Sequence, residues 1–359
     1  MKIKDICTSV TDGSHNPPLG IEKSEYMMLS SKNIFDDEIT FDEPRFLTER
    51  DFEKEHRRTK IAVGDVLFTI VGTVGRIAVV DEDMPTFALQ RSVAVLHPKN
   101  DVCLPRFLMY ALRGKRTYIE NRAKGVAQKG LYLKEVSDID IHIPDISNQE
   151  IIINKLDKVN AIIKLRQKEL LVLDNFIKAR FVEMFGDPIR NTQNRPTTEF
   201  INVVRMQRGF DLPVQDRQQD GKIPVYGSNG VLDHHNVAKI QGGGVITGRS
   251  GTIGKVFYTE GDYWPLNTSL FSVDTHGNNV IYLAYLLQLF NLTRFVEGTG
   301  VPTLNRNMFH NKQIIDAPIE EQNQFADFVH QVDKSKFAVQ KTLEQTQTLF
   351  DSLMQKYFG

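Results

Sequence analysis

The sequence predicts an α+β protein with two pseudo-symmetric globular domains separated by a pair of long antiparallel, coiled-coil helices. Three observations lead to this prediction. The chain of 359 residues is long enough for two domains of ordinary size. Short phrases recur in the same order in its two halves. Each half ends in a long segment whose apolar residues repeat with a helical period.

The internal repeat shows as matching phrases whose separation falls from 179 to 173 residues along the chain, as small deletions in the second copy would produce. The matches are Gly72-Thr73-Val74-Gly75-Arg76 with Gly251-Thr252-Ile253-Gly254-Lys255, Ile146-Ser147-Asn148-Gln149 with Ile319-Glu320-Glu321-Gln322, 87–92 with 264–269, 125–127 with 300–302, and 185–186 with 358–359. Near the start of each copy, residues 29–34 face residues 226–231. The extra length of copy one lies around the charged stretch 49–60, which we interpret as a surface insertion.

Each copy divides into a globular part and a helix, which predicts domains at 1–145 and 190–315 and long spacer helices at 146–189 and 316–359. The globular parts contain short β-type runs, such as residues 66–71 and 93–96, broken by Gly, Asn and Asp. A heptad seam runs from Ile152 through Leu156, Val159 and Ile163. A helix over 149–185 would be about 55 Å long. We expect the two helices to pack antiparallel, with the domains at opposite ends. The alternative is that each helix belongs only to the core of its own domain.

The charge pattern is uneven although the net charge is only −1, a value that argues against a nucleic-acid partner. Residues 106–134 hold eight basic side chains and a single acid, Glu120. In the second half, no acid occurs between Gly298 and Ile315. These stretches predict one basic patch in each half, and a solvated charged face explains either patch equally well.

Composition also indicates the compartment. No run of eighteen uncharged apolar residues occurs, and the N-terminus lacks the apolar core of a signal peptide, so we expect a cytoplasmic protein. Cys7 and Cys103 have no Cys or His at metal-binding spacing. We therefore expect inert thiols, with neither a disulfide nor a zinc site.

No catalytic constellation is apparent in the sequence. Gly248-Arg249-Ser250-Gly251 departs from the Gly-x-Ser-x-Gly nucleophile elbow, because its second glycine comes one residue early. Asn16-Pro17-Pro18-Leu19 lacks the aromatic residue with which adenine methyltransferases stack a flipped base. His234 and His235 have no carboxylates or thiols at metal-ligand spacing. The sequence therefore favours a binding protein without catalytic or metal-ligating residues.

Four phrases of the second copy carry a resemblance that spans the whole chain. They are residues 221–230 (Gly-Lys-Ile-Pro-Val-Tyr-Gly-Ser-Asn-Gly), 248–254 (Gly-Arg-Ser-Gly-Thr-Ile-Gly), 301–306 (Val-Pro-Thr-Leu-Asn-Arg) and 317–322 (Ala-Pro-Ile-Glu-Glu-Gln). With two modules each followed by a long helix, the chain resembles the specificity subunit of type I restriction-modification systems. The resemblance implies two target recognition domains, each reading one half of a split site on double-stranded DNA, with the helices setting the spacer.

The resemblance also implies partners. Two methyltransferase subunits that use S-adenosylmethionine for adenine N6 methylation would dock on the helices, and restriction subunits that use ATP and Mg would add cleavage. The specificity subunit itself would hold no cofactor. Half-sites on successive turns of DNA lie about 34 Å apart, a distance that helices of this length span. Candidate docking sites for partner proteins are helix surfaces left outside the seam, such as Phe176, Phe181, Phe325 and Phe328.

Candidate DNA contacts are the Arg, Lys, Asn, Gln, Ser and Tyr side chains at matching positions of the two copies, since such groups read base edges and bind phosphate. In copy one they are Ser31, Lys32, Gln90, Arg91, Lys124, Gln128 and Lys129. In copy two they are Tyr226, Ser228, Asn229, Arg249, Ser250, Asn305 and Arg306. About half of these residues could instead serve turns or packing, and we assign Gly251, Gly254 and Trp264 to structure.

Two other classes of function remain open at this point. A self-contained DNA methyltransferase or nuclease would methylate or cut DNA as a purified chain. A non-catalytic coiled-coil scaffold would bind no DNA in a sequence-dependent manner, and loss of Arg249 and Arg306 would leave its partner binding unchanged.

Overall fold

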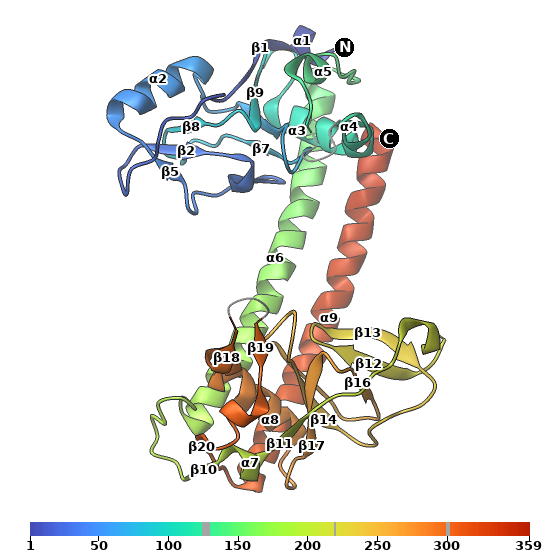
Figure 1. The fold of residues 1–359 in the computed structure, drawn as a ribbon. Coiled ribbons are helices and arrows are strands. Elements are labelled where there is room, and N and C mark those ends of the chain that lie inside the picture. The colour runs from blue at the N-terminus through green and yellow to red at the C-terminus, as the bar shows by residue number, and fades with distance from the viewer. Residues whose placement is uncertain (124–129, 219, 299–301) are drawn as a thin grey trace. The chain divides into compact units, whose positions relative to one another are not determined.

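The computed structural model describes residues 1–123, 130–218, 220–298 and 302–359, which form two compact units. Unit 1 comprises Met1–Leu165 and Leu343–Gly359, and unit 2 comprises Arg166–Thr342. Each long helix therefore contributes one part to each unit (Figure 1). In the described part of the chain, no helix is both long and apolar enough to cross a membrane.

Unit 1 is built on a four-stranded antiparallel sheet in the order β1-β9-β6-β7. Its strands are β1 (Cys7–Asp12), β9 (Val93–Pro98), β6 (Val66–Thr69) and β7 (Ile77–Val79). A second sheet has the order β5-β2-β8, in which β2 and β8 run parallel, and β3 pairs with β4. These strands are β5 (Arg45–Phe46), β2 (Met27–Leu29), β8 (Phe87–Leu89), β3 (Ile34–Phe35) and β4 (Glu38–Ile39).

The short helices of unit 1 are α1 (Ile3–Ile6), η1 (Ser31–Asn33), α2 (Glu49–Thr59), α3 (Pro105–Gly114), α4 (Arg116–Arg122) and α5 (Leu133–Ser137). Helix α3 begins at a proline, whose missing N–H costs nothing in the first turn. It packs against β6 and β7, and its residues Phe107 to Leu112 are all buried. The core of this domain therefore lies between α3 and the sheet.

Unit 2 repeats the strand order of the first two sheets of unit 1. Its main sheet has the order β11-β17-β14-β15, and its second sheet has the order β13-β12-β16, in which β12 and β16 run parallel. The strands are β11 (Arg205–Arg208), β17 (Ser269–Asp274), β14 (Gly244–Gly248), β15 (Val256–Thr259), β13 (Gly230–His235), β12 (Ile223–Gly227) and β16 (Trp264–Pro265). The common strand order confirms the predicted α+β class and the duplicated domain.

Unit 2 contains several further short elements. They are α7 (Phe200–Val203), α8 (Val280–Phe290), the paired strands β10 (Thr197–Glu199) and β20 (Gln313–Ile315), the paired strands β18 (Val296–Glu297) and β19 (Thr303–Leu304), and the 3₁₀ turns η2 (Val214–Asp216), η3 (Leu292–Phe295) and η4 (Arg306–Met308). Helix α8 is apolar on nearly every side and is buried beside β14 and β15, as α3 is beside β6 and β7.

The long helices are α6 (Ile146–Phe185) and α9 (Ile319–Phe358), each of 40 residues. Inside unit 2, the Asp174 carboxylate lies 2.7 Å from the Lys336 ammonium, and the ring of Phe181 meets that of Phe325. Residue numbers therefore increase along α6 in the direction in which they decrease along α9, so these two segments run antiparallel. In unit 1, Lys155 of α6 donates to the Tyr357 hydroxyl of α9 over 3.4 Å. The predicted antiparallel pairing is therefore present within each unit.

The rings proposed as partner-docking sites divide into two kinds. Phe181 and Phe325 are fully buried in the core of unit 2, where they contact each other and Tyr282 or Tyr285. Their assignment as docking sites was wrong, because α8 covers the faces that the heptad seam leaves open. Phe176 is 52% exposed and touches Phe328 edge-on.

The structure also corrects the alignment of the two copies by one residue. Leu29 pairs with Leu89 in the parallel β2/β8 pair, and the equivalent Tyr226 pairs with Pro265. Leu89 therefore corresponds to Pro265, whereas the sequence match placed it opposite Leu266. The short strands carry few distinctive residues here, so only the backbone pairing resolves the register.

The charged insertion of copy one is the helix α2, which packs against β8. Thr48 caps its first turn by accepting from the Asp51 N–H. Phe52, Glu55 and Thr59 are buried on one face. The stretch is therefore a packed part of unit 1, and its surface character holds only for the opposite face.

One buried glutamine at the start of each long helix joins that helix to its domain. The Gln149 side-chain oxygen accepts from the Leu104 N–H, which precedes α3, and its amide nitrogen donates to the carbonyls of Val102 and Pro144. Gln322 repeats this arrangement by accepting from the Asn279 N–H before α8 and donating to Asn278 and Ala317. Both glutamines are almost completely buried, so these bonds satisfy polar groups that water does not reach.

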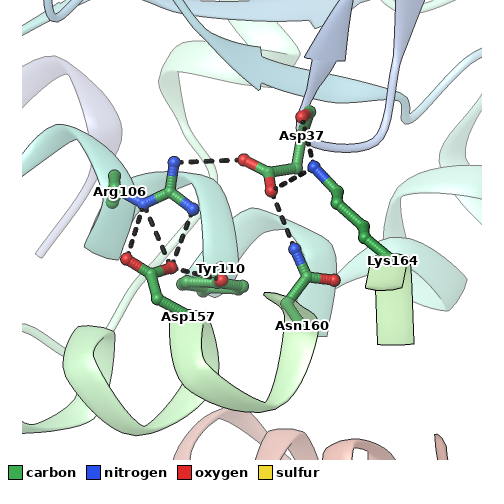
Figure 2. A network of polar contacts seen from close by, with 6 residues as sticks. All are labelled: Asp37, Arg106, Tyr110, Asp157, Asn160 and Lys164. Carbon is green, nitrogen blue, oxygen red and sulfur yellow. Dashed lines mark hydrogen bonds and ion pairs between the residues drawn. The ribbon is translucent and has the colours of Figure 1, made fainter. Parts of the chain in front are cut away.

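A polar network ties a hairpin of unit 1 to the helices (Figure 2). Asp157 of α6 accepts from Nε and Nη2 of Arg106 on α3 and, over 2.6 Å, from the Tyr110 hydroxyl. Asp37, in the β3–β4 turn, contacts Arg106 at 3.1 Å and Lys164 at 2.9 Å. Burial and the hydrogen bond to Asp157 both raise the pKa of Tyr110, so this phenol remains a donor at neutral pH.

We predict that Gln322→Ala destabilises unit 2, because it leaves the Asn279 N–H and the Ala317 carbonyl without their partner. The expected loss is about 2 kcal/mol in the free energy of unfolding. Hydrogen-exchange mass spectrometry of the full chain should show faster exchange in α8. The matched control is Gln324→Ala on the exposed side of the same turn, which should leave exchange unchanged. Equal behaviour of the two variants would contradict the proposed joint.

A second prediction concerns Asp157→Ala, which removes the acceptor of both Arg106 and the buried Tyr110 hydroxyl. We expect the free energy of unfolding to fall by about 2 kcal/mol in urea denaturation. Glu150→Ala, at an exposed site of the same helix, should change it by less than about 0.5 kcal/mol. A loss no larger than that of the control would show that the network contributes little to stability.

Candidate nucleic-acid interface

Several predicted contact residues of copy two lie together at the end of β14 in unit 2. Ser250 and Thr303 form an isolated antiparallel β-bridge, and the Arg249 carbonyl accepts from the Leu304 N–H over 2.8 Å. These bonds bring Arg249 and Ser250 beside Asn305 and Arg306. All four residues are at least partly exposed, so their side chains are available to a ligand.

Ser228 and Asn229 form the β12–β13 turn, which reaches the same place. A Cβ atom on Gly248 would lie 2.8 Å from the Ser228 carbonyl, so the two backbones touch where glycine allows it. The side-chain oxygen of Asn229 accepts from the Lys255 ammonium over 2.8 Å. Lys255 was not among the predicted contacts, and this bond adds a positive charge to the turn.

Asn305 also stabilises the backbone that follows it. The Asn305 side chain caps η4 by accepting from the Asn307 N–H over 3.1 Å. Gly251 and Gly254 have φ angles of 80° and 90°, in the left-handed region that favours glycine. Their assignment to backbone structure agrees with these angles.

Tyr226 is placed differently from the other predicted contacts. Its side chain is 8% exposed and packs edge-on against Tyr263 inside a small aromatic cluster. Burial raises the pKa of its hydroxyl. This position favours a packing role for Tyr226, whose contact with DNA stays a prediction.

In unit 1, Ser31, Gln90 and Arg91 come close together. The Ser31 N–H donates to the Ser92 hydroxyl over 3.0 Å, and the N–H groups of Gln90 and Arg91 donate to the carbonyls of Leu29 and Ser14. Lys32 follows Ser31 and is exposed, but it lines a hollow with Glu38, Asp42 and Glu43. Those carboxylates disfavour a phosphate group beside Lys32.

The other predicted contacts of copy one, Lys124, Gln128 and Lys129, lie outside the residues that the structure describes. The predicted basic patch around them is partly used within the protein. Arg106 binds Asp157, Arg113 lies over the Phe350 ring at 4.7 Å, and Arg116 contacts Asp36 at 2.5 Å. The sequence could not separate these internal charges from solvent-exposed ones, because their partners lie far away in the chain.

Backbone hydrogen bonds show that the two copies share one frame at this place. In unit 1, the Leu131 N–H donates to the Ile70 carbonyl, and the Ile70 N–H donates to the Ser92 carbonyl. In unit 2, the Leu304 N–H donates to the Arg249 carbonyl, and the Arg249 N–H donates to the Thr268 carbonyl. The corresponding pairs are thus Ile70 with Arg249, Val71 with Ser250, Arg91 with Asn267, Leu131 with Leu304, Tyr132 with Asn305, and Leu133 with Arg306.

At this place unit 1 has a cavity of about 620 Å³, which is lined by Asp12, His15, Arg58, Ile70, Val71, Arg91, Gly130, Leu131, Tyr132 and Leu133. Sequence reasoning identified only Arg91 among these residues. Arg58 was missed because its stretch was interpreted as an insertion, and Asp12, His15 and Tyr132 belong to no recognised motif. The sequence pattern held no signal for this cavity beyond the repeat itself.

Neither cysteine is placed for chemistry. Cys7 and Cys103 are buried, and burial raises the pKa of both thiols to about 12. At neutral pH both are therefore protonated and unreactive. Among the described residues, no group of three or more His, Cys, Asp or Glu side chains could hold a metal ion.

The fold is thus a duplicated α+β domain with two long helices and, at equivalent places, clusters of exposed hydrogen-bonding side chains. The chain matches the family model of the type I restriction modification DNA specificity domain over residues 1–175 and 191–346. Since this match covers most of the sequence, the chain belongs to that family.

Individual relatives agree with this assignment. The chain is 28% identical over 160 residues to the type I restriction enzyme EcoBI specificity subunit of Escherichia coli, a match that covers 44% of this chain and 32% of that protein. The match therefore spans about a third of the length of this relative.

Two solved structures show the same fold. The S subunit of a type I restriction-modification system from M. genitalium superimposes with a TM-score of 0.61 at 14% identity, covering 100% of this chain and 95% of that chain. A chain from a structural study of complex assembly and conformational transition of the type I R-M system gives a TM-score of 0.54 at 15% identity, with 100% and 96% covered.

We predict that unit 2 loses stability in mild acid through His310, whose Nε2 accepts from the Met206 N–H over 3.2 Å. Burial lowers the pKa of His310 below its ordinary value of 6.5, and the positive charges of Arg306 and Arg205 lower it further. The unfolded chain therefore binds the proton more readily. The stabilisation is complete above pH 6.5 and decreases as the pH falls below that value.

His310→Gln keeps an acceptor but does not titrate, so its melting temperature should fall less than that of the unmodified chain between pH 7 and pH 5. Thermal denaturation at a series of pH values measures the difference. Identical pH dependence in the two proteins would rule out His310 as the titrating group.

Proposed function

We propose that the protein is a sequence-specific DNA-binding subunit that recognises a bipartite target and directs partner subunits of a type I restriction-modification complex. The observation that carries this proposal is the repeat of one backbone frame in both units, which presents Arg249, Ser250, Asn305 and Arg306 in unit 2 and the exposed Arg91 and Tyr132 in unit 1. Such side chains read base edges in the major groove. Two copies of one reading domain suit a target with two separate halves.

In this proposal the chain itself carries out no chemistry. Methyltransferase subunits, two for each specificity subunit, would supply S-adenosylmethionine-dependent methylation, and restriction subunits would use ATP and Mg. The membership of the chain in the specificity-domain family supports this division of labour. We place the protein in the cytoplasm, where its DNA substrate and partners would be found.

We also propose that the chain is organised as target recognition domains at 1–145 and 190–315 with spacer helices at 146–189 and 316–359. Antiparallel segments of α6 and α9 pack together inside each unit, which supports a helix pair that sets the spacing between half-sites. The predicted DNA contacts are part of this proposal, and the cluster around Arg249 and Arg306 is its strongest member.

The test is to co-express the chain with its methyltransferase subunit and map adenine methylation across a plasmid by single-molecule sequencing. We expect a split motif. The double variant Arg249→Ala/Arg306→Ala should lose about tenfold or more of the selectivity in one half of the motif, because each base contact contributes about 1–3 kcal/mol of discrimination. The other half should be retained.

The control is Arg190→Ala, an exposed arginine of unit 2 that is not among the predicted contacts, which should leave both halves unchanged. An active complex that methylates adenines without any common motif would reject the reader function and favour the scaffold alternative.

A further inference from the structure

The cavity of unit 1 is lined by a cluster of charged side chains around Asp12. Asp12, at the end of β1, is flanked by Arg58 from the last turn of α2 and by His15. Arg91 and Tyr132 complete the polar lining. We propose that this cavity is the base-reading site of unit 1 and that Arg58, positioned by Asp12, selects the base at one position of the half-site. This inference rests on the proposed function.

The Arg58 guanidinium is held in a fixed orientation. Its Nη2 donates to the Asp12 carboxylate over 3.1 Å, and its Nε donates to the Asp12 carbonyl over 3.2 Å. The Asp12 side chain is only 10% exposed, whereas that of Arg58 is 47% exposed. A guanidinium fixed from behind loses little conformational freedom when a ligand binds in front.

The chemistry of this group suits a guanine. The bonds to Asp12 use Nε and one hydrogen of Nη2, and Nη1 remains to donate. An arginine fork donates to O6 and N7 of guanine, which is the commonest specific contact in the major groove. Arg58 also lines a second pocket, together with Ser14 and Asn16, so its side chain borders both pockets.

His15 binds the other oxygen of the same carboxylate, at 2.7 Å. An ionised carboxylate only accepts, so the imidazole donates from Nε2 and keeps Nδ1 for another partner. With both of its oxygens bound, Asp12 presents little negative charge to an approaching DNA backbone. Arg91 on another wall adds a second positive charge.

The repeat places one side of the cavity at the same position of the fold as the Arg249 and Arg306 cluster of unit 2. Five of the residues that line the cavity, Ile70, Val71, Arg91, Tyr132 and Leu133, correspond through the same backbone hydrogen bonds to Arg249, Ser250, Asn267, Asn305 and Arg306 of unit 2. Of the matching residues in unit 1, Arg91 and Tyr132 have hydrogen-bonding side chains and Ile70, Val71 and Leu133 are apolar. Arg58 lies in α2, which has no helical counterpart between β13 and β14 of unit 2. Different residues on a common frame would read different bases, so we expect the two halves of the motif to differ in sequence.

A purely structural role for Arg58 is the competing explanation. Arg58 lies in the last turn of α2, where a positive charge stabilises the helix dipole. That role predicts a change in stability alone. Only a reading role predicts that one base pair of the motif becomes degenerate.

The experiment maps methylation by the co-expressed complex carrying Arg58→Ala or Asp12→Asn, with Arg50→Ala as the matched control. Arg50 is exposed at the other end of α2 and does not line the cavity. We expect Arg58→Ala to lose about tenfold or more of its selectivity at a single base pair of one half. Asp12→Asn, which keeps the shape but weakens the hold on Arg58, should relax the same base pair to a smaller extent.

The half read by unit 2 reports whether the variant complex is assembled, because it should remain intact in every variant. An unchanged motif in Arg58→Ala would overturn the inference while leaving the proposed function in place. A uniform drop in methylation at all sites would overturn it too, since that is the behaviour of a phosphate contact or a structural residue. If the unmodified complex shows no split motif, the proposed function fails and this inference fails with it.

Discussion

One buried glutamine side chain fixes the start of each long helix to its domain. Gln149 and Gln322 each satisfy a backbone N–H before the first turn of a core helix and a carbonyl before the long helix. Unsatisfied buried polar groups are costly, so these bonds specify one orientation of helix against domain. Since the same bonds occur twice, the two copies present their strands to the helices in the same way.

A constant frame then allows variable side chains. The backbone bonds around Ile70 and Arg249 are the same, yet one copy places an apolar residue where the other places an arginine. Sequence reading needs this combination, because the position of a base contact must be rigid while its identity changes between targets. The cavity beside Arg58 and the cluster beside Arg306 lie at equivalent places on this frame.

Some charged side chains form ion pairs within the fold, and others remain available at the surface. Arg106 and Arg116 bind acidic partners within unit 1, so they contribute to folding and offer little to phosphate. Arg58 combines both uses, because its carboxylate partner is buried while its own side chain remains half exposed. A net charge of −1 is therefore compatible with DNA binding, since the relevant charges are local.

The sequence by itself determined the duplicated α+β class, the long helices and the family, because repeats and heptad seams are properties of order along the chain. It also predicted Arg249, Ser250, Asn305 and Arg306 as contacts, which lie within the phrases 248–254 and 301–306 and which the fold brings together. Only the tertiary structure decided the one-residue shift at Leu89, the burial of Phe181 and Phe325, and the meeting of Asp12 with Arg58. These depend on which strands pair and which faces are covered, and long-range packing sets both.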